Sequence, residues 1–177
     1  MPALIVVTGP YGSGKTTLAH RLARRIGCPA ICRDEIKEGM VVSLPGYRPA
    51  PGDLLNQQTF TVFRDVLRVL LDAGATTIAE AAFQGPNWHH LLDGLGPTHT
   101  TRIIECHVAP GTARTRSTER DARSKVRQAA HCAPNPAFTA SDWRGITLDL
   151  PSLRVDTTDG YQPGLDEIVK FCRAGKP

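Results

Sequence analysis

Residues 4–17 of this chain read LIVVTGPYGSGKTT. The first four form a continuous apolar run, which is typical of a strand buried on both faces. Residues 9–16 fit the pattern G-x-x-x-x-G-K-[ST], and a helix is predicted from about Lys15 to Ile26. A glycine-rich loop between such a strand and helix offers backbone N–H groups and a positive helix end to phosphate oxygens. The stretch therefore predicts a phosphate-binding loop.

The side chains of this loop predict which phosphates are bound. Lys15 should reach the β- and γ-phosphates of a nucleotide, and the Thr16 hydroxyl should ligate Mg²⁺. We therefore expect ATP and Mg²⁺ as cofactors. The loop residues expected to bind the nucleotide are Gly9, Gly12, Ser13, Gly14, Lys15, Thr16 and Thr17.

Outward from the loop, apolar strand-like runs alternate with helical patterns along the whole chain. This alternation predicts a single α/β domain over residues 1–177 with a parallel sheet covered on both faces. Further strands are expected at about 29–32, 75–79, 101–108 and 153–155, and further helices at about 34–40, 53–72, 86–94, 110–131 and 164–173.

Composition excludes several other classes of protein. The chain has 177 residues, a hydrophobic fraction of 41% and a formal net charge of +4, which describe a globular protein. No apolar run approaches 18 residues and no basic segment precedes the first one, so neither a membrane span nor a signal peptide is expected. The five cysteines form no CxxC pair, which favours free thiols in the cytoplasm. No histidine shows a spacing such as HExxH, so a zinc site is not expected.

Two carboxylates follow strands at the edge where the phosphate loop is expected. Asp34 comes directly after the second strand, where it could accept a proton from a substrate hydroxyl or simply cap its helix. Glu80 ends the third strand, where it could support Mg²⁺ through water, contact the acceptor substrate, or bond loop amides. Arg33, Tyr47 and Arg48 are further candidates for the acceptor pocket, and a plain surface loop is the alternative for Tyr47 and Arg48.

A basic segment from Arg114 to Arg127 holds six basic residues and two acidic ones. Arg116 and Arg120 are four apart on a predicted helix and share a face, with Arg123 three residues further on. A mobile helix that carries arginines over ATP would neutralise the transferring phosphoryl group and exclude water. The alternatives are a solvated helix face and, for so small a patch, a nucleic-acid contact.

These motifs together resemble the small P-loop kinases around chloramphenicol phosphotransferase, zeta toxin and polynucleotide kinase, with features of gluconate and shikimate kinases. The matching pieces are GPYGSGKTT at 9–17, CRDEIK at 32–37, TIAEAAF at 77–83, ARTRSTERDAR at 113–123 and VDTTDGYQPGLDEIV at 155–169. The resemblance implies a three-layer P-loop NTPase fold with strand order 2-3-1-4-5 and a helical lid at about 110–133.

The resemblance also implies roles for residues. Asp34 would be the catalytic base, and Lys15 and Arg120 would assist the transfer. Arg116 would pack on adenine and Arg120 would meet phosphate, as in adenylate-kinase-like lids, while Thr157 and Thr158 would lie beside the base.

The sequence as a whole therefore predicts a cytoplasmic kinase, a monomer or homodimer, that moves the γ-phosphate of ATP to a hydroxyl of a small molecule. An antibiotic or other natural product is the favoured acceptor. A polynucleotide 5′-hydroxyl kinase, a nucleotide-sugar kinase and a non-kinase nucleotide-binding switch are the alternatives, and the modest charge counts against nucleic acid as the acceptor.

Overall fold

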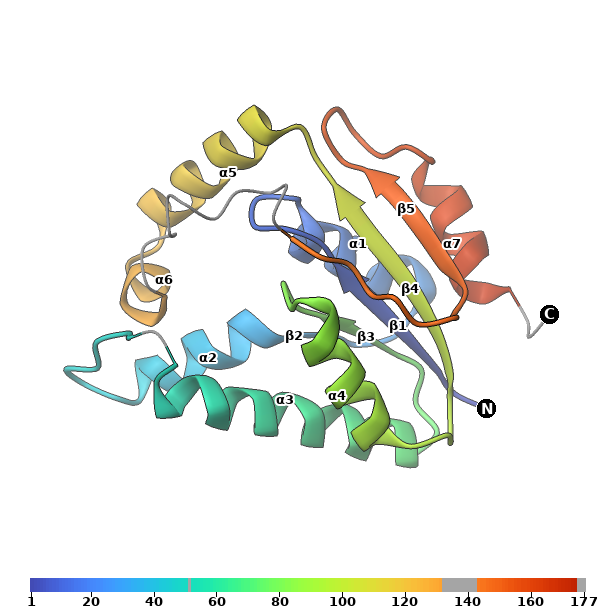
Figure 1. Cartoon of the computed structure of the whole chain (residues 1–177), viewed down its shortest axis with the longest axis horizontal. Coiled ribbons are helices and arrows are strands. Elements are labelled where there is room, and N and C mark those ends of the chain that lie inside the picture. The colour runs from blue at the N-terminus through green and yellow to red at the C-terminus, as the bar shows by residue number, and fades with distance from the viewer. Residues whose placement is uncertain (51, 132–142, 175–177) are drawn as a thin grey trace.

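The fold is known from a computed structural model that describes residues 1–50, 52–131 and 143–174. Its centre is a five-stranded sheet in which all neighbouring strands run parallel, in the order β2-β3-β1-β4-β5 (Figure 1). This confirms the predicted α/β class and strand order. The strands are β1 (Ala3–Thr8), β2 (Ala30–Cys32), β3 (Thr77–Glu80), β4 (Thr100–His107) and β5 (Ser152–Asp156).

Helices connect these strands and cover both faces of the sheet. Most lie within a few residues of the predicted ranges. They are α1 (Lys15–Ile26), α2 (Arg33–Val42), α3 (Leu54–Asp72), α4 (Gly85–Leu95), α5 (Pro110–Arg123), α6 (Lys125–Ala130) and α7 (Leu165–Arg173).

The alternating side chains of β1 divide the core into two apolar clusters. Ile5 and Val7 pack with buried residues of α1 and α7 on one face. Leu4 and Val6 pack with buried residues of α3 and α4 on the other (Figure 1). Both faces of the central strand are therefore dry, which is why its sequence is a continuous apolar run.

The predicted single helix over residues 110–131 is wrong, because the chain breaks at Ser124 into α5 and α6. Ser124 has an extended backbone, with φ −130° and ψ 105°, and its hydroxyl accepts a hydrogen bond from the Arg127 amide at 3.2 Å. Serine suits this capping position because its side chain satisfies an amide that has no partner in the first helical turn. After the break, α6 packs against α2 (Figure 1). The side chain of Arg127 thereby reaches Asp34, two residues after the end of β2. The end of the predicted lid, residues 132 and 133, lies outside the described residues.

Within the described part of the chain, none of the helices combines the length and the apolar character needed to cross a membrane.

Candidate nucleotide and phosphoryl-transfer site

The loop between β1 and α1 has a backbone that two of its glycines make possible. Gly9 and Gly12 have φ of 147° and 75°, a range that favours glycine. A Cβ on Gly9 would lie 2.4 Å from the Cys106 carbonyl oxygen, and one on Gly12 would lie 2.1 Å from that of Ala113. The loop is thus packed closely against β4 and the first turn of α5, with no room for side chains at these positions.

Lys15 and Thr16 meet the buried carboxylate of Glu80 below this loop. The Thr16 hydroxyl donates to Glu80 Oε2 at 3.2 Å, and Lys15 Nζ lies 3.9 Å from Glu80 Oε1. Lys15 Nζ also donates to the Pro10 carbonyl oxygen at 3.2 Å, which holds it under the loop. Burial raises the pKa of Glu80, and the positive charge of Lys15 opposes this rise.

The Thr16 hydroxyl and the Glu80 carboxylate fit Mg²⁺. Both are oxygen donors, which Mg²⁺ prefers, and they already lie within hydrogen-bond distance of each other. A bound cation would also offset the cost of burying Glu80, which is 3% exposed. The two residues predicted to serve the metal are therefore brought together.

Asp34 lies at the start of α2, where an arginine from α6 reaches it. Arg127 Nη2 lies 3.4 Å from Asp34 Oδ2, and its other two nitrogens bind Glu38 Oε1 at 2.7 Å and Asp121 Oδ1 at 2.9 Å. The guanidinium of Arg127 is almost fully buried among these three carboxylates. It therefore joins α2, α5 and α6 at one point.

The charges around Asp34 keep it ionised. Burial would raise the pKa of Asp34, but the positive charges of His131, Arg33, Lys15 and Arg127 outweigh burial and hold the pKa at about 2. Arg127 also connects Asp34 with the phosphate-binding loop, because its guanidinium lies over the ring of Tyr11. Asp34 is thus a carboxylate between the loop and α6 at neutral pH.

The ring of Tyr11 ties the loop to α5 and α6. Lys15 Nζ lies 5.7 Å from the ring centre, and the guanidinium carbons of Arg120 and Arg127 each lie 5.9 Å from it. These distances suit cation–π attraction. Arg120 Nε is buried without a hydrogen-bond partner among the described residues, so it has a donor to offer a ligand.

The remaining residues predicted to bind the nucleotide differ in whether they lie beside the loop. Arg116 donates to the carbonyl oxygens of Thr157 and Thr158 at 2.9 and 3.0 Å, and Thr157 Oγ1 donates to the Ser13 carbonyl at 2.8 Å. These residues therefore lie beside the loop.

Other predicted nucleotide-binding residues are directed elsewhere. Arg123, with its side chain 80% exposed, pairs with Glu119 one turn earlier, at 3.8 Å. Thr17 is exposed on α1, and Ser13 Oγ is buried with no hydrogen-bond partner in the described chain.

The three acceptor candidates outside these groups lie in different surroundings. Arg33 donates to Asp34 Oδ1 at 3.2 Å and to Asn56 Oδ1 at 2.8 Å, so it borders the site. The Tyr47 hydroxyl donates to Asp53 Oδ2 at 2.5 Å, and its ring packs on a small apolar cluster between α2, α3 and α6. Arg48 is exposed in the following loop. Their part in acceptor binding stays a prediction.

Sequence reasoning missed the two residues that hold the site together, Arg127 and Tyr11. Arg127 belongs to the basic segment, but an unbroken helix gives no reason to expect that Arg127, rather than another arginine of the segment, reaches Asp34. Tyr11 fills a variable position of the loop motif, where the pattern accepts any residue. A serine at 124, three residues before Arg127, was the available signal for the break.

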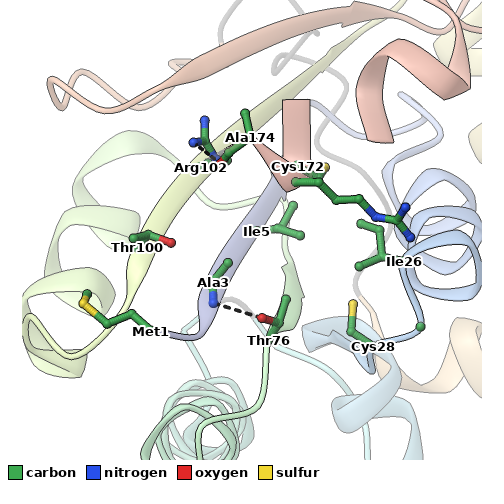
Figure 2. Close-up of a pocket in the computed structure, with 12 residues that line it drawn as sticks. Met1, Ala3, Ile5, Ile26, Cys28, Thr76, Thr100, Arg102, Cys172 and Ala174 are labelled. Atoms are coloured by element: carbon green, nitrogen blue, oxygen red, sulfur yellow. Dashed lines mark hydrogen bonds between the residues drawn. The ribbon is translucent and has the colours of Figure 1, made fainter. Parts of the chain in front are cut away.

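A cavity of about 550 Å³ lies at the other edge of the sheet and is separate from this site. Ala3 and Thr100, the first residues of β1 and β4, line it together with Cys28, Arg102 and Cys172 (Figure 2). Ligands of open parallel sheets bind beyond the carboxyl ends of the strands, whereas this cavity is at the amino ends. None of the residues that line it is among the predicted site residues.

Several solved structures share the fold of this chain. A candidate kinase from Chloroflexus aurantiacus J-10-fl shares 26% identity over 97% of each chain, with a TM-score of 0.83. The adenylylsulfate (APS) kinase CysC of Mycobacterium tuberculosis, solved with AMPPNP and APS, shares 14% identity over 98% of each chain, with a TM-score of 0.66. Kti12 of Chaetomium thermophilum, solved with ADP-AlF3, shares 15% identity over 98% of this chain and 100% of that one, with a TM-score of 0.65.

No curated protein matches the chain in sequence. The profile of the AAA domain family matches residues 4–136, a span that contains the phosphate-binding loop, Asp34, Glu80 and Arg127. By this match over most of its length, the chain belongs to the AAA domain family.

Proposed function

We propose that this protein is an ATP-dependent kinase that transfers the γ-phosphate to a hydroxyl of a small molecule. The observation that carries the proposal is the place of Asp34, a carboxylate held by Arg127 within the electrostatic range of Lys15. A phosphate loop alone needs no such carboxylate, whereas transfer to an alcohol needs an acceptor for its proton.

The residues divide the work as follows. The loop amides and Lys15 bind and orient the β- and γ-phosphates, and Thr16 and Glu80 hold Mg²⁺, which neutralises charge on the phosphates when bound. Arg120 and Arg127 stabilise charge on the transferring group from the side of α5 and α6. Asp34 orients the acceptor hydroxyl and takes its proton as the oxygen–phosphorus bond forms and the bond to the β-phosphate oxygen breaks.

Several positive charges keep Asp34 ionised and ready to accept a hydrogen bond from the acceptor hydroxyl. They are His131, Arg33, Lys15 and Arg127, which together hold the pKa of Asp34 at about 2 against the effect of burial.

An antibiotic or another natural product is the acceptor class that we propose. Its support is the resemblance to chloramphenicol phosphotransferase in chain length and in the spacing of the elements. A polynucleotide acceptor has less support, because a formal net charge of +4 is modest for a groove that binds a nucleic-acid backbone.

The test is phosphoryl transfer from γ-labelled ATP to a panel of hydroxylated antibiotics and metabolites, with products identified by mass spectrometry. Asp34→Asn should lower kcat about 10²- to 10⁴-fold and leave ATP affinity nearly unchanged. Asp65→Asn on α3 is the matched control and should keep full activity.

Other outcomes would change the assignment. Transfer to a DNA or RNA 5′ end, but to no small molecule, would make the protein a polynucleotide kinase. Slow ATP hydrolysis that no acceptor accelerates and that Asp34→Asn leaves unchanged would favour a nucleotide-binding switch.

A further inference from the structure

His20, Cys32 and Glu35 bring three different metal-binding groups together at the junction of β2 and α2. The His20 Nε2, the Cys32 Sγ and a Glu35 carboxylate oxygen all lie within 4.8 Å of one another. His20 Nε2 is 2.7 Å from Glu35 Oε1 and 3.7 Å from Cys32 Sγ. The roles given above to the nucleotide site use neither His20 nor Glu35, and Cys32 adjoins that site through a hydrogen bond with Glu80.

The backbone explains why they converge. Cys32 is the last residue of β2 and the residue that precedes the first turn of α2, so Glu35 three positions later lies on the same side. Asp34, between them, is directed to Arg127 instead. His20 comes from α1, one turn beyond Thr16.

We propose that His20, Cys32 and Glu35 form a binding site for one divalent transition-metal ion of the Zn²⁺ type. Imidazole nitrogen, thiolate sulfur and carboxylate oxygen are the three donors that Zn²⁺ takes from proteins. Burial and the neighbouring carboxylates of Glu80 and Glu35 raise the pKa of the Cys32 thiol, so the ion would displace the thiol proton to water on binding. The thiolate formed and the Glu35 carboxylate then balance the charge of a divalent ion. A hard ion such as Mg²⁺ disfavours sulfur, so this site differs in chemistry from the oxygen pair Thr16 and Glu80.

The distances suit a tetrahedral ion after a small adjustment. Tetrahedral bonds of zinc to nitrogen, oxygen and sulfur place neighbouring donors about 3.3–3.6 Å apart. The separation of His20 and Cys32 is already close to this range, and Glu35 needs to withdraw from His20 by about 0.6 Å. The side chains of His20 and Glu35 are 37% and 49% exposed, so both border solvent, which could supply water as a fourth ligand.

A metal here would fasten α1 to the beginning of α2. Asp34 lies in the short stretch between two of the ligands, so the ion would restrict the backbone that carries it. An ion that binds the folded chain but not the unfolded chain would also raise the free energy of unfolding.

The experiment is titration of the metal-free full-length protein with Co²⁺, without nucleotide or Mg²⁺. We expect a near-ultraviolet thiolate-to-cobalt charge-transfer band that saturates at one equivalent and disappears on addition of Zn²⁺. Zn²⁺ should also raise the thermal unfolding midpoint. X-ray absorption of the zinc-loaded protein should show one sulfur ligand among nitrogen and oxygen ligands.

Variants identify the ligands. Cys32→Ser should abolish the band, and His20→Gln and Glu35→Gln should weaken Co²⁺ binding at least about 10-fold. Cys28→Ser and His90→Gln are the matched controls and should bind as the wild type does. Circular dichroism checks that Cys32→Ser is folded, and His20→Gln changes a partly exposed side chain, so it tests the site even if the cysteine variant is unstable.

Two results would overturn the proposal. One is the lack of any thiolate band in the wild type at stoichiometric Co²⁺, which would leave His20 and Glu35 as an ordinary hydrogen-bonded pair. The other is a band that survives Cys32→Ser or that His20→Gln leaves at full affinity, which would place the metal on another thiol.

Discussion

Lys15 is the residue at which the loop, the buried carboxylate and the aromatic ring of the site come together. The residue is 6% exposed, and its ammonium group donates to the Pro10 carbonyl oxygen, close to Glu80 and the Tyr11 ring. A buried cation in such a place is costly unless charges around it compensate. Glu80 compensates it now, and phosphate oxygens would do so in the complex with ATP.

Lys15→Met should therefore weaken ATP binding about 10- to 100-fold, because it removes a charge-assisted hydrogen bond to phosphate while keeping the length of the side chain. Isothermal titration calorimetry measures the change. Lys170→Met on the exposed side of α7 is the control and should bind ATP normally. An affinity within threefold of the wild type would show that Lys15 does not reach the phosphates.

At the scale of elements, the break at Ser124 turns the chain so that α6 carries Arg127 into the site. α5 leaves the end of β4, and α6 then packs on α2, so that Arg127 binds carboxylates of α2 and α5 together. The same guanidinium lies over Tyr11 of the loop. A single buried cation thus joins α5 and α6 to α2 and to the loop.

Arg127→Met should lower the free energy of unfolding by about 2 kcal/mol or more, because it leaves Asp34, Glu38 and Asp121 without their shared partner in a partly buried place. Urea denaturation followed by circular dichroism measures this loss. Arg123→Met, which removes an exposed pair with Glu119, should change stability by less than about 0.5 kcal/mol. Equal effects of the two variants would contradict the role given to Arg127.

At the scale of the whole molecule, the ionisation of Asp34 couples the site to folding. The pKa of Asp34 is about 2 in the folded protein and has a reference value of 3.8, so the carboxylate favours the folded state above the reference pKa. This contribution is lost as the pH falls from about 4 toward 2. The active site and the stability of the fold therefore respond to acid together.

The difference in unfolding free energy between the wild type and Asp34→Asn should accordingly depend on pH. The advantage of the wild type should shrink by about 2 kcal/mol between pH 6 and pH 2, an upper value because the side chain is 25% exposed. Urea unfolding of both proteins across this range measures it. A difference that stays constant would mean that the charges of α2 and α6 do not act on Asp34.

The architecture of the sheet could be predicted because local signals agreed with it. The apolar run of β1 is buried on both faces, and the helical spacing of Leu18 and Leu22 matches their burial on α1. The phosphate loop is equally local, since Gly9 and Gly12 take conformations that favour glycine and lie against backbone oxygens. Such patterns carry their structural reason within a few neighbouring residues.

The sequence could also predict that Asp34 and Glu80 lie near the loop, because both follow or end parallel strands, whose carboxyl ends meet at one edge of the sheet. The hydrogen bond between Thr16 and Glu80 agrees with this placement. Arg127 did not follow from any such rule. It lies 93 residues after Asp34, and its contact requires a break at Ser124 that helical periodicity did not predict. The cluster of His20, Cys32 and Glu35 was missed for a similar reason. His20 lies on α1, 12 residues before Cys32, and no metal-binding motif has that spacing.

The sequence by itself determined the α/β class and the glycine-rich loop with its lysine and threonine, because glycine conformations, apolar runs and turn signals act over short distances. Only the tertiary structure decided which arginine meets Asp34 and which side chains surround His20. Those contacts join residues far apart in the chain, and they form only when packing fixes the angle between α5 and α6 and seats α1 beside β2.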